Sequence, residues 1–240
     1  MFGTALMKAQ NMVRITADQD IPFLHGVVEP RAEMDYLPAR LITRETIARS
    51  DALLIRTRTR CDEALLSGTP VRFIGTATIG TDHIDTGYCR EHGITVVNAP
   101  GCNAGSVMQY VASVLFTLQQ KDNFSLPGKK IGIVGVGNVG SRIEKLARNL
   151  GMEPLLNDPP RERSEGSAGF ISLQRLLQES DIVTLHVPLT LQGNDPTFHL
   201  IGREELLLMP PGTVLINTAR GEVIDTVALE ASIKEHRSPQ

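Results

Sequence analysis

The glycine-rich stretch KKIGIVGVGNVGSRIEKLARNLG, residues 129–151, constrains the fold of this 240-residue chain most strongly. Gly135, Gly137 and Gly140 stand in the spacing G-x-G-x-x-G, directly after a strand-like apolar run. The amphipathic helix predicted after them has its apolar positions at Ile143, Leu146, Ala147 and Leu150. In this context the three glycines permit a tight turn, close approach of the backbone to a pyrophosphate, and close packing of helix on strand. The helix N-terminus adds free N–H groups and a partial positive charge.

An acidic residue stands at the place where a dinucleotide site needs one. Asp158 follows Gly140 by 18 residues and ends the strand-like run EPLLND. A carboxylate there can accept hydrogen bonds from ribose hydroxyls and would repel a 2′-phosphate, which favours NAD over NADP. With Asn138 and Val139 of the turn, these residues form the predicted cofactor site. The alternative is a glycine-rich turn with a capping Asp.

Strand-like and helix-like runs alternate along the chain. The first series of strand-like runs is VRITA (13–17), ALLIRT (52–57), VRFIGTA (71–77) and ITVVNA (94–99). The second is KIGIVG (130–135), EPLLND (153–158), DIVTLHV (181–187) and TVLINTA (213–219). Helices are predicted at RETIARSD (44–51) and CDEALLSG (61–68), and a polar surface loop at RERSEGSAG (161–169). This rhythm indicates βαβ units and parallel sheets.

A long helix separates the two series. GSVMQYVASVLFTLQQ, residues 105–120, has apolar residues at helical spacing on more than one side, as at a domain or subunit junction. We therefore predict an α/β protein with two doubly wound parallel-sheet domains, residues 12–103 and 104–240. Residues 1–11 are expected to be an extension outside the fold.

Composition excludes several classes of function. The net charge is −3, so nothing indicates binding to nucleic acid or to an anionic membrane. No apolar run reaches the roughly 18 residues of a membrane span. The three cysteines, Cys61, Cys89 and Cys102, are widely spaced, which argues against a zinc site or a disulfide framework and fits a reducing cytoplasm.

Several segments, in order, resemble the D-2-hydroxyacid dehydrogenase family. They are GTATIGTDHID (75–85), NAPGCNAGSV (98–107), GIVGVGNVG (132–140), HVPLT (186–190), FHLIG (198–202) and LINTARGEVID (215–225). The resemblance implies a flavodoxin-like substrate domain at 12–103 and a Rossmann NAD-binding domain at 104–240, with the active site in the cleft between them. It also implies a homodimer formed through the NAD-binding domain.

Four stretches favour one branch of the family. They are GTATIGTDHID, the Gly-Cys-Asn of NAPGCNA, the Asn of GVGNVG and the double Pro of NDPP. The resemblance implies a small phosphorylated 2-hydroxy acid as substrate, namely 4-phospho-D-erythronate, oxidised with NAD in pyridoxal 5′-phosphate biosynthesis. The alternatives are another 2-hydroxy acid such as phosphoglycerate, or an NAD-binding module without turnover.

The resemblance also assigns individual residues. Arg220, after the strand TVLINTA, is implied to bind the substrate carboxylate and to polarise the C2 oxygen, which suits a planar guanidinium. Thr57 and Thr78 match substrate-binding positions, while Val187 matches a position that contacts NAD. Thr218 and Ala219, next to Arg220, complete the predicted cofactor set. Neighbouring arginines, Arg56, Arg58 and Arg60, either add positive potential or are solvated.

Other reactive side chains are interpreted as structural. His186 is expected to be structural or close to the cofactor, and His199 to be a structural histidine with its hydrogen bonds satisfied. Cys102 is interpreted as a packing residue, because no base and orienting group are visible near it in the sequence.

The final segment raises a separate expectation. In the family a His accepts the hydroxyl proton and a Glu orients that His, both downstream of the Arg; we find neither segment in these 240 residues. VALEASIKEH is expected to be a helix whose Leu229 and Ile233 face the sheet, and His236 is not interpreted as a substitute base. We therefore expect both domains to be incomplete at their C-terminal ends, TVLIN to be an unpaired edge, and turnover by this chain to be impaired.

Overall fold

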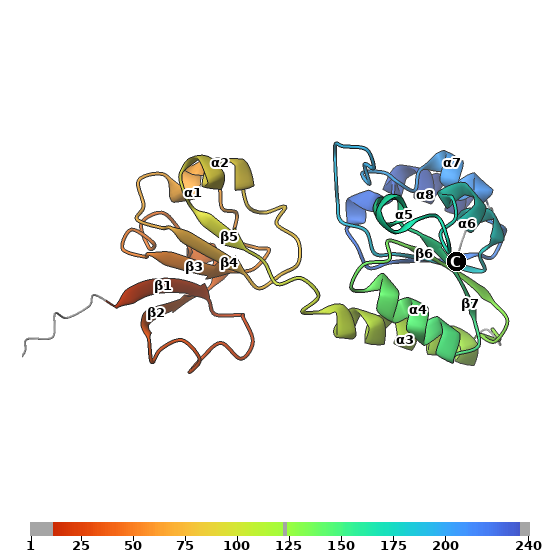
Figure 1. Cartoon of the computed structure of the whole chain (residues 1–240), viewed down its shortest axis with the longest axis horizontal. Helices are drawn as coiled ribbons and strands as arrows, with labels where there is room; N and C mark the ends of the chain where they lie inside the picture. Colours follow the sequence, from red (N-terminus) through yellow and green to blue (C-terminus); the bar gives the residue numbers. More distant parts are fainter. Residues whose placement is uncertain (1–11, 122–123, 236–240) are drawn as a thin grey trace, which may run out of the picture. The chain divides into compact units, whose positions relative to one another are not determined.

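The computed structural model describes residues 12–121 and 124–235, and the chain divides into two compact units between Cys102 and Asn103 (Figure 1). The expected extension at residues 1–11 and the side chain of His236 lie outside the described residues. Each unit is built on one parallel sheet, as the alternation of strand-like and helix-like runs predicts. None of the helices in the described ranges is long and apolar enough to span a membrane.

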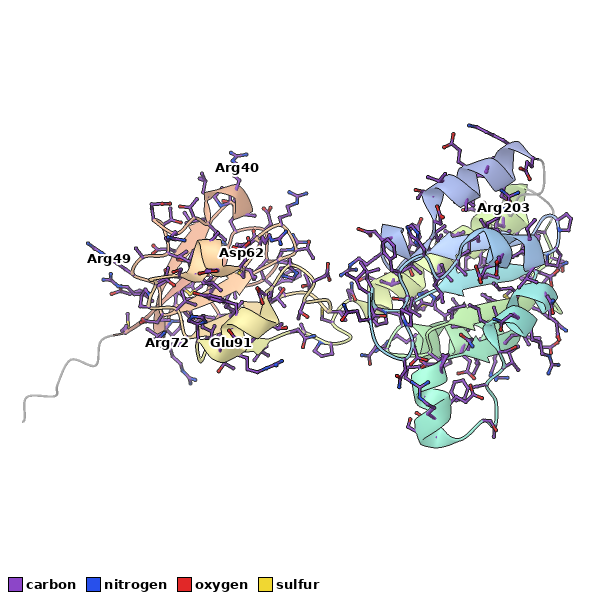
Figure 2. The ribbon with its side chains drawn as sticks, turned by 90° about the horizontal axis from the view of Figure 1, so that it is seen from above. Arg40, Arg49, Asp62, Arg72, Glu91 and Arg203 are labelled. Atoms are coloured by element: carbon purple, nitrogen blue, oxygen red, sulfur yellow. The ribbon has the colours of Figure 1, made fainter. Side chains whose placement is uncertain are left out.

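The first unit contains a five-stranded parallel sheet in the order β2-β1-β3-β4-β5. Its strands are β1 (Val13–Asp18), β2 (Ala32–Leu37), β3 (Ala52–Ile55), β4 (Phe73–Thr76) and β5 (Thr95–Val97). Its helices are η1 (Ala39–Leu41), α1 (Glu63–Leu66) and α2 (Thr86–Glu91). This is the flavodoxin-like strand order, so the predicted fold class is confirmed. Figure 2 shows Arg40 and Arg49 pointing outward from this unit.

The core of the first unit lies on one face of its sheet. Leu53 and Ile74 from the strands are buried with Leu66 of α1 and Cys89 of α2 in one apolar cluster. Each helix begins at an aspartate whose side chain accepts a backbone N–H, Asp62 for α1 and Asp85 for α2. The opposite face carries Leu54, Gly75 and Val97 in register across β3, β4 and β5, and Val97 is 48% exposed.

The second unit contains a four-stranded parallel sheet in the order β7-β6-β8-β9. Its strands are β6 (Lys130–Val134), β7 (Glu153–Asn157), β8 (Ile182–Leu185) and β9 (Val214–Asn217). Its helices are α3 (Ala104–Lys121), α4 (Gly140–Asn149), α5 (Pro159–Glu165), α6 (Leu173–Glu179), α7 (Arg203–Leu208), η2 (Gly221–Val223) and α8 (Thr226–Lys234). Within the described ranges β9 pairs with β8 and forms one edge of the sheet.

Helices cover both faces of the second sheet, so this unit is doubly wound (Figure 1). On one face, α3 and α4 bury apolar residues such as Leu115 and Ile143 against the strands. On the other face, α6, α7 and α8 form a second cluster that includes Leu176 and Leu206. Strands buried on both faces read as continuous apolar runs, and all four residues of β8 are buried.

The structure corrects several local predictions. Residues 44–49 form turns and not a helix, because the hydroxyl of Thr46 bonds the carbonyl oxygens of Leu41 and Thr43 and so competes with helical bonding. The strand β2 was not predicted. Residues 161–165 of the predicted loop are helical in α5, since Asp158 caps this helix and prolines occupy its first turn. In α8, Leu229 packs on the core but Ile233 is 51% exposed.

Candidate functional site

A cavity of about 660 Å³ opens at the carboxyl ends of β6, β7 and β8. The residues that line it include Val134 and Gly135 at the end of β6 and Asp158 after β7. His186 and Val187, which follow β8, also line it. The chain leaves β6 in one direction toward β7 and reaches β8 on the other side, so the cavity lies at the point where the strand order reverses. Open α/β sheets bind ligands at this position.

The glycine turn between β6 and α4 leaves no room for side chains at two of its glycines. Gly135 has φ +86°, and a Cβ on it would lie 2.9 Å from the carbonyl group of His186. A Cβ on Gly140 would lie 2.1 Å from the carbonyl oxygen of Gly135, so α4 can approach β6 only through a glycine. A Cβ on Gly137 would meet nothing within 4 Å, because this glycine faces open space beside the cavity.

These features fit a dinucleotide. Gly137 offers bare backbone to an approaching phosphate, and α4 is a ten-residue helix whose N-terminus has no side-chain cap. Asp158 is held in place because one carboxylate oxygen accepts the N–H of Val136 at 2.8 Å and the other accepts the N–H of Arg161 at 3.0 Å. Each oxygen keeps acceptor capacity for a ribose hydroxyl.

His186 lies on the wall of the cavity between two threonines. Its Nε2 is 2.9 Å from the hydroxyl of Thr184, and its Nδ1 is 2.8 Å from the hydroxyl of Thr218. Burial lowers the pKa of His186 to about 4, so the ring is neutral near pH 7. The Thr218 hydroxyl donates to the carbonyl oxygen of Leu185 at 3.3 Å, which favours a proton on Nδ1. A general base needs a pKa near the working pH, so His186 is better suited to holding the loop than to accepting protons.

The loop that carries Arg220 is fixed by Asn217, the last residue of β9. The side chain of Asn217 accepts the N–H of Ala219 at 2.9 Å and donates to the carbonyl oxygen of Arg220 at 2.8 Å. Thr218, next in the chain, links this loop to His186 and so to the cavity wall. Arg220 is half-buried at the carboxyl end of β9, and its backbone direction is set by these bonds.

The structure brings together some of the predicted cofactor residues. Gly135, Gly137, Asp158 and Val187 line the cavity. Asn138, Val139, Gly140, Thr218 and Ala219 do not line it, although they adjoin residues that do. Sequence reasoning missed further lining residues on the loops after β7 and β8, among them Pro159, Pro160, Glu162, Thr190 and Asp195. Their position in the sequence could have indicated them, because they follow the carboxyl ends of β7 and β8, the two strands that flank β6.

The predicted substrate residues lie at the carboxyl edge of the first sheet. Thr57 and Thr78 each follow their strand by two residues, and the strands pair with Ile55 opposite Thr76. Thr57 is exposed. The Thr78 hydroxyl lies 2.7 Å from that of Thr76 and donates to the carbonyl oxygen of Gly80 at 3.1 Å.

The three arginines near Thr57 do not act as one group. Arg56 donates to the carbonyl oxygen of Asp20 at 2.9 Å, and Arg60 pairs with Asp62 at 3.1 Å. Arg58 is exposed. Arg58 is therefore the best placed of the three to add positive potential beside Thr57.

One interpretation of a single residue is wrong. Cys102 is exposed and is not a packing residue, because it lies in a turn before α3. His199 is exposed and has φ +52°, with its ring stacked on Phe198 and its Nδ1 3.9 Å from the Asp225 carboxylate. Its interpretation as a structural histidine stays a prediction.

Comparisons with known proteins agree with this geometry. Residues 106–239 match the family model described as D-isomer specific 2-hydroxyacid dehydrogenase, NAD binding domain. An erythronate-4-phosphate dehydrogenase from Bacteroides fragilis is 49% identical over 223 residues, which are 92% of this chain and 64% of the relative. One from Chromohalobacter salexigens is 47% identical over 92% of this chain and 58% of the relative. The chain thus spans less than two thirds of the length of these relatives.

Solved structures show the same architecture. An NAD⁺-bound 3-phosphoglycerate dehydrogenase of Entamoeba histolytica gives a TM-score of 0.81 at 27% identity, over 93% of this chain and 77% of that one. A D-lactate dehydrogenase of Aquifex aeolicus, complexed with NAD and lactic acid, gives 0.79 at 27% identity, over 94% of this chain and 74% of that one. By its family match over residues 106–239, the chain belongs to the D-isomer specific 2-hydroxyacid dehydrogenase family, and those residues are its NAD-binding domain.

Proposed function

We propose that this chain binds NAD and serves the oxidation of 4-phospho-D-erythronate at C2, giving 3-hydroxy-2-oxo-4-phosphobutanoate, a step of pyridoxal 5′-phosphate biosynthesis. The observation that carries the proposal is the glycine turn with Asp158 on the wall of the cavity, together with a relative 49% identical that is named erythronate-4-phosphate dehydrogenase. The turn supports binding of a dinucleotide, and the relative's name supports the reaction.

The residues divide the work by chemistry. The nicotinamide cofactor, when bound, supplies the hydride acceptor. Gly137 and the N-terminus of α4 would hold its phosphates, and Asp158 its adenosine ribose. Arg220 would bind the substrate carboxylate and stabilise negative charge that develops on the C2 oxygen, while Asn217 keeps its backbone in place. The hydroxyls of Thr57 and Thr78 would hold the phosphate end of the substrate.

Proton transfer needs a separate partner. The His and Glu that the family resemblance implies lie downstream of the Arg, and His186 is a poor substitute because its pKa is about 4.

Two measurements on the same protein separate the alternatives. NADH binding is followed by fluorescence, and turnover of 4-phospho-D-erythronate by absorbance of the NADH formed, with 3-phosphoglycerate as competing substrate. Binding with a preference for 4-phospho-D-erythronate supports the proposal. Binding without turnover supports an NAD-binding module, and a preference for 3-phosphoglycerate supports another branch of the family. A chain that does not bind NADH contradicts both functions.

We also propose that the protein works as a homodimer in the cytoplasm. Tyr110 and Phe116 on α3 of the NAD-binding domain are 60% and 47% exposed, and aromatic residues are enriched at protein interfaces. The three cysteines are free, as expected in a reducing compartment. Analytical ultracentrifugation tests the dimer, because Tyr110→Glu should yield monomers while the exposed substitution Gln119→Glu on the same helix should not.

A further inference from the structure

The loop after β8 forms a strap beside the nucleotide cavity. We call residues 190–197 the strap. Its base is closed by two threonines, since the N–H of Thr190 donates to the Thr197 hydroxyl at 2.8 Å and the N–H of Thr197 donates to the Thr190 hydroxyl at 3.1 Å. Thr197 is buried, while Gln192 and Asn194 at the tip are exposed and line the cavity. The strap is therefore fixed at its base and open to solvent at its tip.

The helix α5 forms another part of the cavity rim. Pro159, Pro160 and Glu162 of this helix line the cavity. Arg161 fastens α5 to the glycine turn, because its guanidinium donates to the carbonyl oxygen of Val136 at 2.6 Å. The helix is thus anchored to the glycine turn.

One ion pair joins the strap to α5. The Arg163 guanidinium donates from both terminal nitrogens to the two carboxylate oxygens of Asp195, with Nη1 3.0 Å from Oδ1. Asp195 lines the cavity and its side chain is 28% exposed. Arg163 lowers the pKa of the Asp195 carboxyl, so the pair stays charged at neutral pH. Two parallel hydrogen bonds fix geometry better than a single contact does.

We propose that the Arg163–Asp195 pair is a latch that closes the strap over the cavity and slows release of the bound dinucleotide. The inference rests on the proposed NAD binding. Arg163 does not line the cavity, so its effect would act through the position of the strap and not through contact with the ligand. Arg163 and Asp195 are therefore positioning residues, and the ligand class they retain is a dinucleotide whose adenosine half occupies this end of the sheet.

The test measures how fast NADH leaves the intact chain. In stopped-flow experiments NADH is displaced from the protein by excess NAD⁺, and its fluorescence is followed. Arg163→Ala and Asp195→Ala should each raise the release rate about three- to fivefold, the size expected for a half-exposed ion pair. The double variant should be no faster than either single variant, because the two changes remove one interaction. Exchanging the charges, Arg163→Asp with Asp195→Arg, should restore slow release.

A matched control and the parent chain separate the possible failures. Arg148→Ala removes a similar exposed pair with Glu144 on α4, away from the cavity, and should leave the release rate unchanged. If the parent binds NADH and both single variants release it at the parental rate, the latch proposal is wrong and NAD binding stands. The same conclusion follows if the effects of the two single variants multiply in the double variant. If the parent does not bind NADH at all, the proposed function and the latch are both wrong.

Discussion

The two sheets share a local strand order but differ in the segment that leads out of their first strand. In the second unit, β6 runs into a glycine turn and then directly into the ten-residue helix α4, and Gly135 and Gly137 of the turn line the cavity. In the first unit, β1 ends at the buried Asp18, and residues 19–31 form turns before β2 begins. Phe23 in this segment is 95% exposed with φ +61°. Among the described residues, only the second unit therefore has a helix that begins directly after the turn that follows the first strand of its sheet.

The faces of the two sheets also differ. Both faces of the second sheet are covered by helices, whereas in the first unit the core cluster lies on one face and the row Leu54, Gly75 and Val97 lies on the other, with Val97 48% exposed. One strand order therefore carries two different kinds of proposed ligand site. In the proposed function, the second sheet would hold an anion through backbone N–H groups and a helix dipole, while the first would use hydroxyls such as those of Thr57 and Thr78.

The largest expected effect comes from filling the tightest glycine of the second unit. Gly140→Ala should lower the free energy of unfolding by about 3 kcal/mol, because the new Cβ meets a backbone carbonyl that cannot move aside. Gly75→Ala in the first unit should cost only about 1 kcal/mol, since its neighbours are the ends of the Leu54 and Phe73 side chains. Urea denaturation of both variants measures the difference. Equal losses would contradict the contrast between the two units.

Some parts of the proposed nucleotide site could be predicted from the sequence, and others could not. The glycine spacing and Asp158 could be recognised, because a tight turn without side chains and a carboxylate at the end of a strand are both local features of the sequence. The cavity wall after β8 was not, since Asp195 and Thr190 become neighbours of the glycine turn only through parallel pairing of β6 with β8. The bond from His186 to Thr218 was equally invisible because it joins residues 32 positions apart.

The local errors have physical causes too. The segment 44–49 has helical spacing around the buried Ile47, but hydroxyls of Thr43 and Thr46 satisfy the backbone in turns. The strand β2 has the sequence AEMDYL, in which charged residues alternate with partly buried ones, as suits an edge strand. In α5 the capping signal was present in Asp158 and Pro159, and it outweighed the polar composition of the segment.

A second prediction concerns the pH dependence of stability that the buried ring of His186 causes in the second unit. The pKa of His186 falls from 6.5 to about 4 on burial, so the folded state prefers the neutral ring. The stabilisation is complete above pH 6.5 and is lost as the pH falls toward 4, at up to about 1.4 kcal/mol per pH unit. Between pH 7 and pH 5 the loss from this residue should approach roughly 2 kcal/mol. His186→Gln should flatten that part of the profile, measured by denaturation at each pH, whereas an unchanged slope would show that other groups cause it.

Gly137→Ala separates binding from folding in the second unit. Its Cβ meets no atom within 4 Å, so the melting temperature should stay within a degree or two of the parent. NADH binding should weaken about tenfold, because the methyl group stands where the phosphate approaches the backbone. Fluorescence titration gives the dissociation constant. Parental affinity in a folded Gly137→Ala protein would place the pyrophosphate elsewhere.

The smallest expected effect concerns the first unit. Thr57→Val should weaken binding of 4-phospho-D-erythronate about fivefold, the size of one exposed hydrogen bond to a charged group, and should leave NADH affinity unchanged. Thr95→Val, at the opposite end of the same sheet, is the matched control. Calorimetric titration of both variants decides the matter, and equal affinities would remove Thr57 from the proposed site.

The central claim is that the nucleotide binds at the carboxyl edge of the second sheet and not at the equivalent edge of the first. Hydrogen–deuterium exchange with and without NADH tests it most directly, because it reports both edges in one experiment. We predict slower exchange in residues 134–140 and 186–197 and no change in residues 19–31. Protection of residues 19–31, or none in the glycine turn, would contradict the account.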